Sequence, residues 1–272
     1  NKENIDIMTA FFRQLQYYGE KDKDVYFISA DHGAWALADF KKKINKQYMN
    51  IGISEQNMTS LAAGMALNGK KVFIFTITPF VMQRCFEQIK MDICFSNLPV
   101  TIVGNGSSLT YAYHGTSHQA IEDLAMMRSL PNLKIINPSD NSSSREAVKI
   151  AYKSKSPVYI KLDKGFFPDL YTKSFNFSEG VLEIVNTKSD LCIISTGSML
   201  HNAKKISDNL KKNNLISNII DIFIIKPLNK KKIKKILSKQ KLIVTLEEQH
   251  IDGGIGSQIC EIIAEENINT KI

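Results

Sequence analysis

The sequence predicts an α/β protein built from two doubly wound domains with mostly parallel sheets. Short apolar runs alternate with amphipathic stretches along the 272 residues, a pattern typical of parallel strands joined by helices. Glycine, proline, aspartate or asparagine closes the apolar runs, and 23% of the residues are charged, as in a globular chain. We expect a first domain at residues 1–166, a linker at 167–184 and a second domain at 185–272.

Five runs in the first domain are predicted to be buried strands because they are short and rich in β-branched or aromatic residues. They are Val25–Ala30, Lys71–Ile77, Val100–Gly104, Leu133–Asn137 and Val158–Leu162. A further strand is expected to end within Tyr48–Ile53. These runs supply the sheet of the first domain.

Three helices are expected between these strands. Residues 55–68 place apolar side chains on one face and stop at Gly69, a residue suited to a helix C-terminus. Residues 79–95 open with Pro79 in the first turn, and residues 140–154 begin with a cluster of capping residues.

The second domain repeats the alternation of strands and helices. Its expected strands are Leu191–Ser195, Ile216–Ile225 and Leu242–Leu246. Helices are expected from Ser198, over residues 229–241 and after Gly253. The chain contains no internal sequence repeat.

The formal net charge of +8 is concentrated in one segment. Residues 229–241 hold seven lysines and no acid, and the rest of the chain carries a net charge of +1. Ile233, Ile236 and Leu237 repeat at helical spacing, so the lysines cover the wet face of an amphipathic helix. The segment lacks the interleaved aromatic residues and the arginines typical of nucleic-acid binding. A non-enzymatic binding protein that uses this helix is one alternative function.

Several classes of protein are disfavoured. No apolar run reaches the length of a membrane span, and residues 1–6 show no signal-peptide pattern, so we expect no membrane contact. The four cysteines lie far apart, without a C-x-x-C spacing, which argues against a disulfide scaffold or a zinc knuckle. We expect a protein of the reducing cytoplasm.

Glu55 and Phe80 follow strands of the first domain. Glu55 opens a helix directly after Tyr48–Ile53, and ligands gather at the carboxyl ends of strands in open α/β sheets. A glutamate in the first turn of a helix also complements the helix dipole and needs no catalytic role. Phe80 leaves a strand at a turn, where it serves either as a core residue or as a platform for a cofactor ring.

His114 and His118 flank a Gly-Thr-Ser segment after the strand Val100–Gly104. The glycine favours a loop over a helical metal site, and no third ligand at zinc-like spacing is visible. We expect His118 to begin the helix that holds Ile121, which would direct it towards the ligand edge of the sheet. A loop histidine that only hydrogen-bonds locally is the alternative.

Arg84 and Lys161 are isolated bases near the same edge. Each is placed either to hold a phosphate or to form an ion pair. The turn Gly253–Gly256 resembles a phosphate-binding turn at a helix N-terminus. Because it lacks the G-x-G-x-x-G and P-loop spacings, a tight turn with close helix–strand packing is favoured.

The order of these segments carries a resemblance to a known family. Asn50–Met58 and Ala62–Ala66, then residues 79–88, His114–Gln119 and Asn137–Asp140, resemble in sequence the pyrimidine-binding domain of transketolase-type enzymes. Residues 191–265 resemble the transketolase C-terminal domain. The chain is most similar to free-standing C-terminal transketolase subunits, in enzymes that depend on thiamine diphosphate.

The resemblance implies roles for particular residues. Glu55 and His118 would be catalytic, with Glu55 hydrogen-bonding the aminopyrimidine of thiamine diphosphate. Phe80, which would pack on that ring, and Asp31 would complete the cofactor contacts. Substrate binding would fall to four basic residues, namely His114, His118, Arg84 and Lys161. His114 departs from the family, which carries an aspartate there; a histidine can donate a hydrogen bond where an aspartate accepts one.

The resemblance also implies a missing half. The chain has no Gly-Asp-Gly followed by a downstream asparagine, the motif that holds Mg²⁺ and the diphosphate in this family. We therefore expect no metal site in this chain and a second, N-terminal subunit that carries the motif, in a dimer of heterodimers. The expected reaction transfers a two-carbon ketol or acyl unit between sugars or sugar phosphates. The β subunit of a 2-oxo acid dehydrogenase E1 component is the alternative enzyme.

Overall fold

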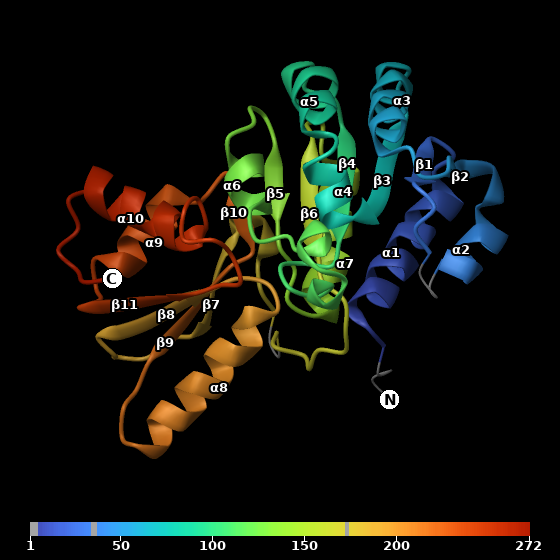
Figure 1. The fold of residues 1–272 in the computed structure, drawn as a ribbon. Coiled ribbons are helices and arrows are strands. Elements are labelled where there is room, and N and C mark those ends of the chain that lie inside the picture. Colours follow the sequence, from blue (N-terminus) through green and yellow to red (C-terminus); the bar gives the residue numbers. More distant parts are fainter. Residues whose placement is uncertain (1–4, 34–36, 172–173) are drawn as a thin grey trace.

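The chain forms two α/β lobes that lie side by side, each built on its own sheet (Figure 1). A computed structural model describes residues 5–33, 37–171 and 174–272. In these residues the first sheet has seven strands, in the order β10-β5-β6-β4-β3-β1-β2, and the second has four, in the order β11-β8-β9-β7. Within these sheets only the β10–β5 and β7–β9 pairs are antiparallel. The predicted α/β class with mostly parallel sheets is confirmed.

The first lobe follows the predicted alternation of strands and helices closely. Its strands are β1 (Val25–Ser29), β2 (Tyr48–Asn50), β3 (Lys71–Ile77), β4 (Val100–Asn105), β5 (Lys134–Ile136), β6 (Val158–Leu162) and β10 (Ile224–Lys226). Its α-helices are α1 (Ile7–Lys21), α2 (Leu37–Lys43), α3 (Glu55–Leu67), α4 (Thr78–Met82), α5 (Phe86–Gln88), α6 (Asp123–Arg128) and α7 (Asn141–Lys153).

Helices cover both faces of the first sheet. Side chains of α1, α2 and α7 pack on one face in one hydrophobic cluster, and those of α3, α4 and α6 pack on the other in a second cluster. Neighbouring residues of β1 show the division, since Phe27 contacts Phe12 of α1 while Ile28 lies in the cluster with Met58 of α3. A strand covered on both faces must be apolar throughout, which is why these strands read as continuous apolar runs.

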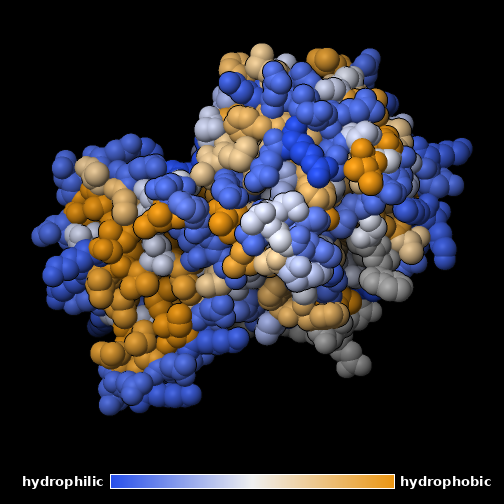
Figure 2. Space-filling view, in the orientation of Figure 1, coloured by the Kyte–Doolittle hydropathy of each residue, from blue (hydrophilic) through white to orange (hydrophobic). Residues whose placement is uncertain are grey.

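The second lobe is smaller. Its strands are β7 (Val181–Val185), β8 (Leu191–Ser195), β9 (Asn218–Ile222) and β11 (Leu242–Leu246), and its helices are α8 (Met199–Lys212), α9 (Lys230–Leu237) and α10 (Ile255–Glu265). Figure 2 shows hydrophobic side chains gathered on the surface of this lobe, above α8. Among its exposed large apolar residues are Leu242 and Val244 of β11.

The predicted strand Ile216–Ile225 is wrong in its extent. The run divides at Phe223 into β9, in the second sheet, and β10, which crosses to the first sheet and pairs with β5. Phe223 is fully buried between the two strands. Because the whole run is apolar, its sequence carries no sign of the division, which depends on where the two sheets offer pairing partners.

Two other expectations differ from the structure. Strand β7 begins inside the segment 167–184 that we expected to be a linker, because Val181–Val185 pairs antiparallel with β9 as an edge strand. The expected helix over residues 79–95 breaks after α4 and resumes as α5 and a π-helix at Ile89–Phe95. The Gln56 Nε2 of α3 donates to the carbonyl oxygen of Arg84 at 3.0 Å. In a continuous helix, this carbonyl oxygen would accept from a backbone N–H four residues later.

The lysine segment forms an amphipathic helix as predicted, but α9 covers Lys230–Leu237 and is shorter than the expected 229–241. In α9 the side chains of Ile233, Ile236 and Leu237 are buried and the lysines face outward. No helix in the described part of the chain is long and apolar enough to cross a membrane.

Candidate active site

Residues from three segments, which follow three different strands, meet at the carboxyl edge of the first sheet. Glu55 follows β2, Phe80 and Arg84 follow β3, and His114 and His118 follow β4. Because β2, β1, β3 and β4 are consecutive parallel neighbours, their carboxyl ends open at the same edge. The structure thus brings together five of the seven residues that we expected at the site.

Glu55 is buried although it is charged. It is the first residue of α3 and only 5% exposed. Its Oε1 lies 3.1 Å from the Arg84 Nη1, an ion pair that balances the buried carboxylate. The Arg84 side chain is 48% exposed, so it reaches the carboxylate from the solvent side.

Arg84 also covers the ring of Phe80. The guanidinium carbon lies 3.9 Å from the ring centroid, within the range of a cation–π contact. Pro79 near the start of α4 fixes the first turn of the helix that holds Phe80, and Arg84 lies in the turn that follows α4. The flat guanidinium therefore lies on an aromatic face while it bonds a carboxylate.

The two histidines extend this cluster. The ring of His118 meets that of Phe80 edge to face at 5.0 Å and lies 4.9 Å from that of His114, between centroids. Burial lowers the pKa of His118, and the neighbouring His114 and Arg84 lower it further. At neutral pH the ring of His118 is therefore able to accept a proton.

His118 does not begin a helix as expected. It ends a 3-10 turn at Thr116–His118, and α6 starts only at Asp123. A second 3-10 turn holds His114, and Gly115 at φ +86° joins the two turns. Residues with a Cβ rarely adopt this backbone conformation, and it allows the turn between the two histidines, whose ring centroids lie 4.9 Å apart.

A second polar group beside the histidines escaped the sequence analysis. Asn105, at the end of β4, places its Nδ2 2.6 Å from the His32 Nε2 and 3.0 Å from the Tyr111 hydroxyl. Burial lowers the pKa of His32 to about 4, with a smaller contribution from Lys164, so the ring is neutral and its Nε2 can accept. His32 follows β1 and Asn105 ends β4. Their position at the carboxyl ends of strands is therefore the feature of the sequence that identifies them as candidate site residues.

Asp31 lies at the same edge but makes different contacts. Its Oδ1 accepts from the Asn50 Nδ2 and its backbone N–H donates to the Asn50 Oδ1, both at 3.0 Å. This reciprocal pair ties the end of β1 to the end of β2. Within the described residues, no hydrogen bond of Asp31 reaches Glu55 or Phe80.

The structure places Lys161 in the interior and in an ion pair, which is the alternative to phosphate binding that the sequence left open. The residue is 2% exposed and its Nζ lies 2.8 Å from the Asp123 Oδ1. Asp123 also accepts from the Tyr159 hydroxyl at 2.6 Å, and burial together with this carboxylate raises the pKa of Tyr159. Lys161 points from β6, a strand buried along its whole length, so its charge requires an internal counterion.

The glycine turn before α10 is a tight turn, as favoured from its spacing. The backbone N–H groups of Ile255 and Gly256 donate to the carboxylate of Glu247, each at 2.7 Å. The anion at this helix N-terminus is thus a side chain of the protein itself. Elsewhere in the described residues, no group of three or more His, Cys, Asp or Glu side chains is placed to hold a metal ion.

Comparison with known proteins gives this arrangement a family. Residues 3–168 match the transketolase pyrimidine binding domain, and residues 180–272 match the transketolase C-terminal domain. The chain belongs to the transketolase family. The resemblance stated from the sequence motifs is confirmed. Glu55, Phe80, Arg84, His114 and His118, which we call the Glu55 cluster, lie in the part of the chain that matches the transketolase pyrimidine binding domain.

Individual relatives are transketolase chains of similar length. A subunit of the apulose-4-phosphate transketolase of Phocaeicola vulgatus is 30% identical over 265 residues, which are 97% of this chain and 85% of that protein. The putative transketolase C-terminal section of Methanocaldococcus jannaschii is 32% identical over 257 residues, 93% of this chain and 80% of the relative. A solved split gene transketolase, described as an inactive beta4 tetramer, has a TM-score of 0.90 and 30% identity, covering 99% of this chain and 88% of that one. The prediction of a transketolase C-terminal subunit is confirmed by these matches.

Proposed function

We propose that this chain is the C-terminal subunit of a two-chain transketolase that depends on thiamine diphosphate and transfers a two-carbon ketol unit between sugars or sugar phosphates. The observation that carries the proposal is the buried carboxylate of Glu55 beside the ring of Phe80. Transketolase family membership and the similarity to relatives named as a transketolase subunit or C-terminal section support it.

The residues present fit the aminopyrimidine of thiamine diphosphate. That ring is flat, has an aromatic face and presents a ring nitrogen that needs a carboxylic partner. The Arg84 guanidinium, also flat and rich in nitrogen, already makes the two matching contacts, at 3.1 Å with Glu55 and 3.9 Å above Phe80. Cofactor binding therefore requires Arg84 to move aside, and its half-exposed side chain is free to do so.

Each residue of the cluster has a task in such a reaction. Bound thiamine diphosphate supplies the electron sink that cleavage of a carbon–carbon bond next to a carbonyl requires. Glu55 holds a proton at the pyrimidine nitrogen, and Phe80 fixes the plane of the ring. His118, neutral because of its lowered pKa, exchanges a proton with a substrate hydroxyl. His114 donates a hydrogen bond to a neighbouring hydroxyl, and Arg84, once displaced, remains close enough to meet a substrate phosphate.

We propose that the diphosphate and Mg²⁺ are held by a partner subunit with the Gly-Asp-Gly motif, in a dimer of heterodimers. Two large apolar residues close in sequence to Glu55 and His114 are open to a partner, since Ile53 is 76% and Tyr113 75% exposed. We further propose that the protein works in the cytoplasm, where its separate, unpaired cysteines stay reduced.

The test uses the two subunits reconstituted together. Glu55→Gln keeps the size of the side chain but removes the carboxyl group, and we expect turnover to fall by roughly 10²–10⁴-fold while circular dichroism is unchanged. Glu87→Gln, on the exposed side of the nearby α5, is the matched control and should keep full turnover.

Two results would contradict the proposal. One is turnover of the Glu55→Gln complex within twofold of the unaltered complex. The other is full turnover by this chain alone when thiamine diphosphate and Mg²⁺ are supplied, because the split of the site between two chains would then be wrong.

A further inference from the structure

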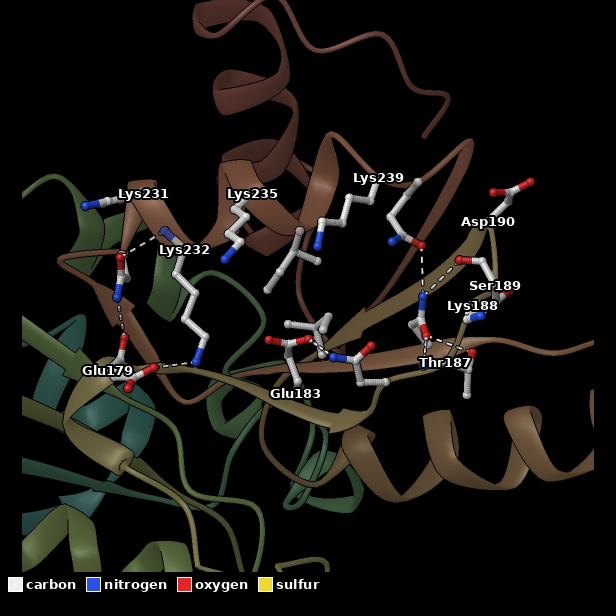
Figure 3. Close-up of a pocket in the computed structure, with 16 residues that line it drawn as sticks. Glu179, Glu183, Thr187, Lys188, Ser189, Asp190, Lys231, Lys232, Lys235 and Lys239 are labelled. Carbon is white, nitrogen blue, oxygen red and sulfur yellow. Dashed lines mark hydrogen bonds and ion pairs between the residues drawn. The ribbon is translucent and has the colours of Figure 1, made fainter.

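A cavity of about 750 Å³ lies in the second lobe, between α9 and the edge strand β7 (Figure 3). Its walls come from α9 and the turn after it, from β7, from the turn between β7 and β8, and from β9. None of its lining residues belongs to the Glu55 cluster. We call it the lysine cavity, because five lysines and three acidic residues line it.

Only one of its five lysines has a counterion among the described residues. Lys232, Lys235 and Lys239 repeat at helical spacing along one side of α9 and the turn beyond it, and Figure 3 shows all three extending into the cavity. The Lys232 ammonium is paired with Glu179. Those of Lys235 and Lys239 have no hydrogen bond or ion pair with any residue in the described part of the chain. Lys188 and Lys231, which also line the cavity, are likewise unpaired within the described residues, so the cavity carries a surplus of positive charge.

The inner wall offers an accessible hydrogen-bond donor, the Gln240 amide, which has no protein acceptor among the described residues. Asn218 and Gln240 are 5% and 7% exposed. The Gln240 Oε1 accepts from the Asn218 Nδ2 at 3.1 Å, and the Asn218 Oδ1 accepts from the backbone N–H of Thr187 at 2.7 Å. The amide nitrogen of Gln240, which can donate two hydrogen bonds, has no acceptor among the described residues. This nitrogen is not enclosed by protein atoms, so it is open to donate to a ligand oxygen in the cavity.

The opposite wall carries the complementary group. The carboxylate of Glu183 accepts a hydrogen bond from Asn186 at 2.6 Å and is paired with no cation in the described residues. The other two acids are already paired, Glu179 with Lys232 and Asp190 with Lys241. Figure 3 shows Glu183 across the cavity from Lys235 and Lys239.

We propose that the lysine cavity binds a small phosphorylated metabolite that also carries hydroxyl groups, a sugar phosphate or a nucleotide. Phosphate oxygens accept charge-assisted hydrogen bonds from Lys235 and Lys239 and a further bond from the Gln240 amide. Glu183 accepts from the hydroxyl groups on the other side. The Glu183 carboxylate would repel a simple anion without hydroxyl groups. A neutral sugar would leave the ammonium groups of Lys235 and Lys239 unpaired. This site is separate from the proposed active site and does not depend on its chemistry.

The test is calorimetric titration of the full chain, without a partner, using ribose 5-phosphate and ADP as probes. We expect one of the two to bind with one site per chain and ribose alone not to bind. Lys235→Ala/Lys239→Ala should weaken that binding at least tenfold. Lys211→Ala/Lys212→Ala removes the same charge from the exposed end of α8 and should leave binding unchanged. Tighter binding of ADP assigns a nucleotide, and tighter binding of ribose 5-phosphate assigns a sugar phosphate.

Glu183→Gln adds a second, independent measurement. This substitution should lower the affinity for the hydroxyl-bearing ligand. It should leave the affinity for inorganic pyrophosphate unchanged or raise it. The proposal fails if neither probe binds the unaltered chain, or if the two lysine pairs lower affinity equally. It also fails if RNA binds through Lys235 and Lys239 and neither small ligand competes with it. Thermal unfolding of each variant checks that these surface changes leave the fold intact.

Discussion

Replacement of Lys161 tests whether its charge serves the fold or a substrate. Lys161→Met keeps the linear side chain and removes the ammonium group that faces the fully buried Asp123. At the observed 2.8 Å, the attraction between the two charges is about 6 kcal/mol for an effective dielectric constant of about 20. Desolvation of both charges offsets much of this in the intact pair, but the variant leaves Asp123 charged and buried alone. The expected loss of unfolding free energy is about 3–5 kcal/mol.

Urea unfolding followed by circular dichroism at pH 7 measures this loss. Lys161→Met/Asp123→Asn removes both charges and keeps an acceptor for the Tyr159 hydroxyl, so it should recover most of the stability. Lys149→Met is the matched control, because Lys149 forms a partly exposed pair with Glu146 on α7. Its removal should cost less than about 1 kcal/mol.

One pattern of results would refute this reasoning. If Lys161→Met unfolds within about 1 kcal/mol of the unaltered chain, while the reconstituted enzyme shows a raised KM for a phosphorylated substrate only, then Lys161 binds phosphate. The role first expected from the sequence would then be correct, and the ion pair with Asp123 would be incidental.

Two further predictions concern single buried groups. Burial raises the pKa of Asp221, which accepts from Tyr171, from 3.8 to about 8, so the folded chain holds a proton that the unfolded chain releases. Unfolding free energy should therefore fall by about 1.4 kcal/mol per pH unit between about 4 and 8. Asp221→Asn should flatten that slope in urea titrations at pH 5 to 8, and an unchanged slope contradicts the assignment. Gly106 has φ +79°, and an added Cβ would lie 2.2 Å from the Tyr111 ring, so Gly106→Ala should cost at least about 1–3 kcal/mol in thermal unfolding. Gly64→Ala, in an open helical position, should instead stabilise by about 0.5–1 kcal/mol, and equal effects of the two would count against the steric reasoning.

Much of the fold was predictable because it depends on local pattern. The run Val158–Leu162 is a strand with the predicted bounds, and Glu55 begins a helix at the predicted residue. Apolar periodicity, helix-stop glycines and capping residues act over a few positions, so they are readable in one sequence. The division of residues 216–225 between two sheets was not readable, because each half is equally apolar and only pairing distinguishes them.

The candidate site was predictable in position but not in contacts. Parallel strands place their following residues at one edge, which is enough to gather Glu55, Phe80, Arg84 and the two histidines. His32 was missed, although it also follows a strand.

By itself, the sequence determined the α/β class, the edge at which the polar residues gather and the amphipathic lysine helix. Only the tertiary structure decided which charges meet. Arg84 pairs with Glu55 across 29 positions of sequence, and Lys161 pairs with Asp123 across 38. Lys235 finds no partner in the described residues, although acids lie in the same lobe. The free energy of a charge depends on its neighbours in space and on its exposure to water, and neither is encoded by sequence spacing alone.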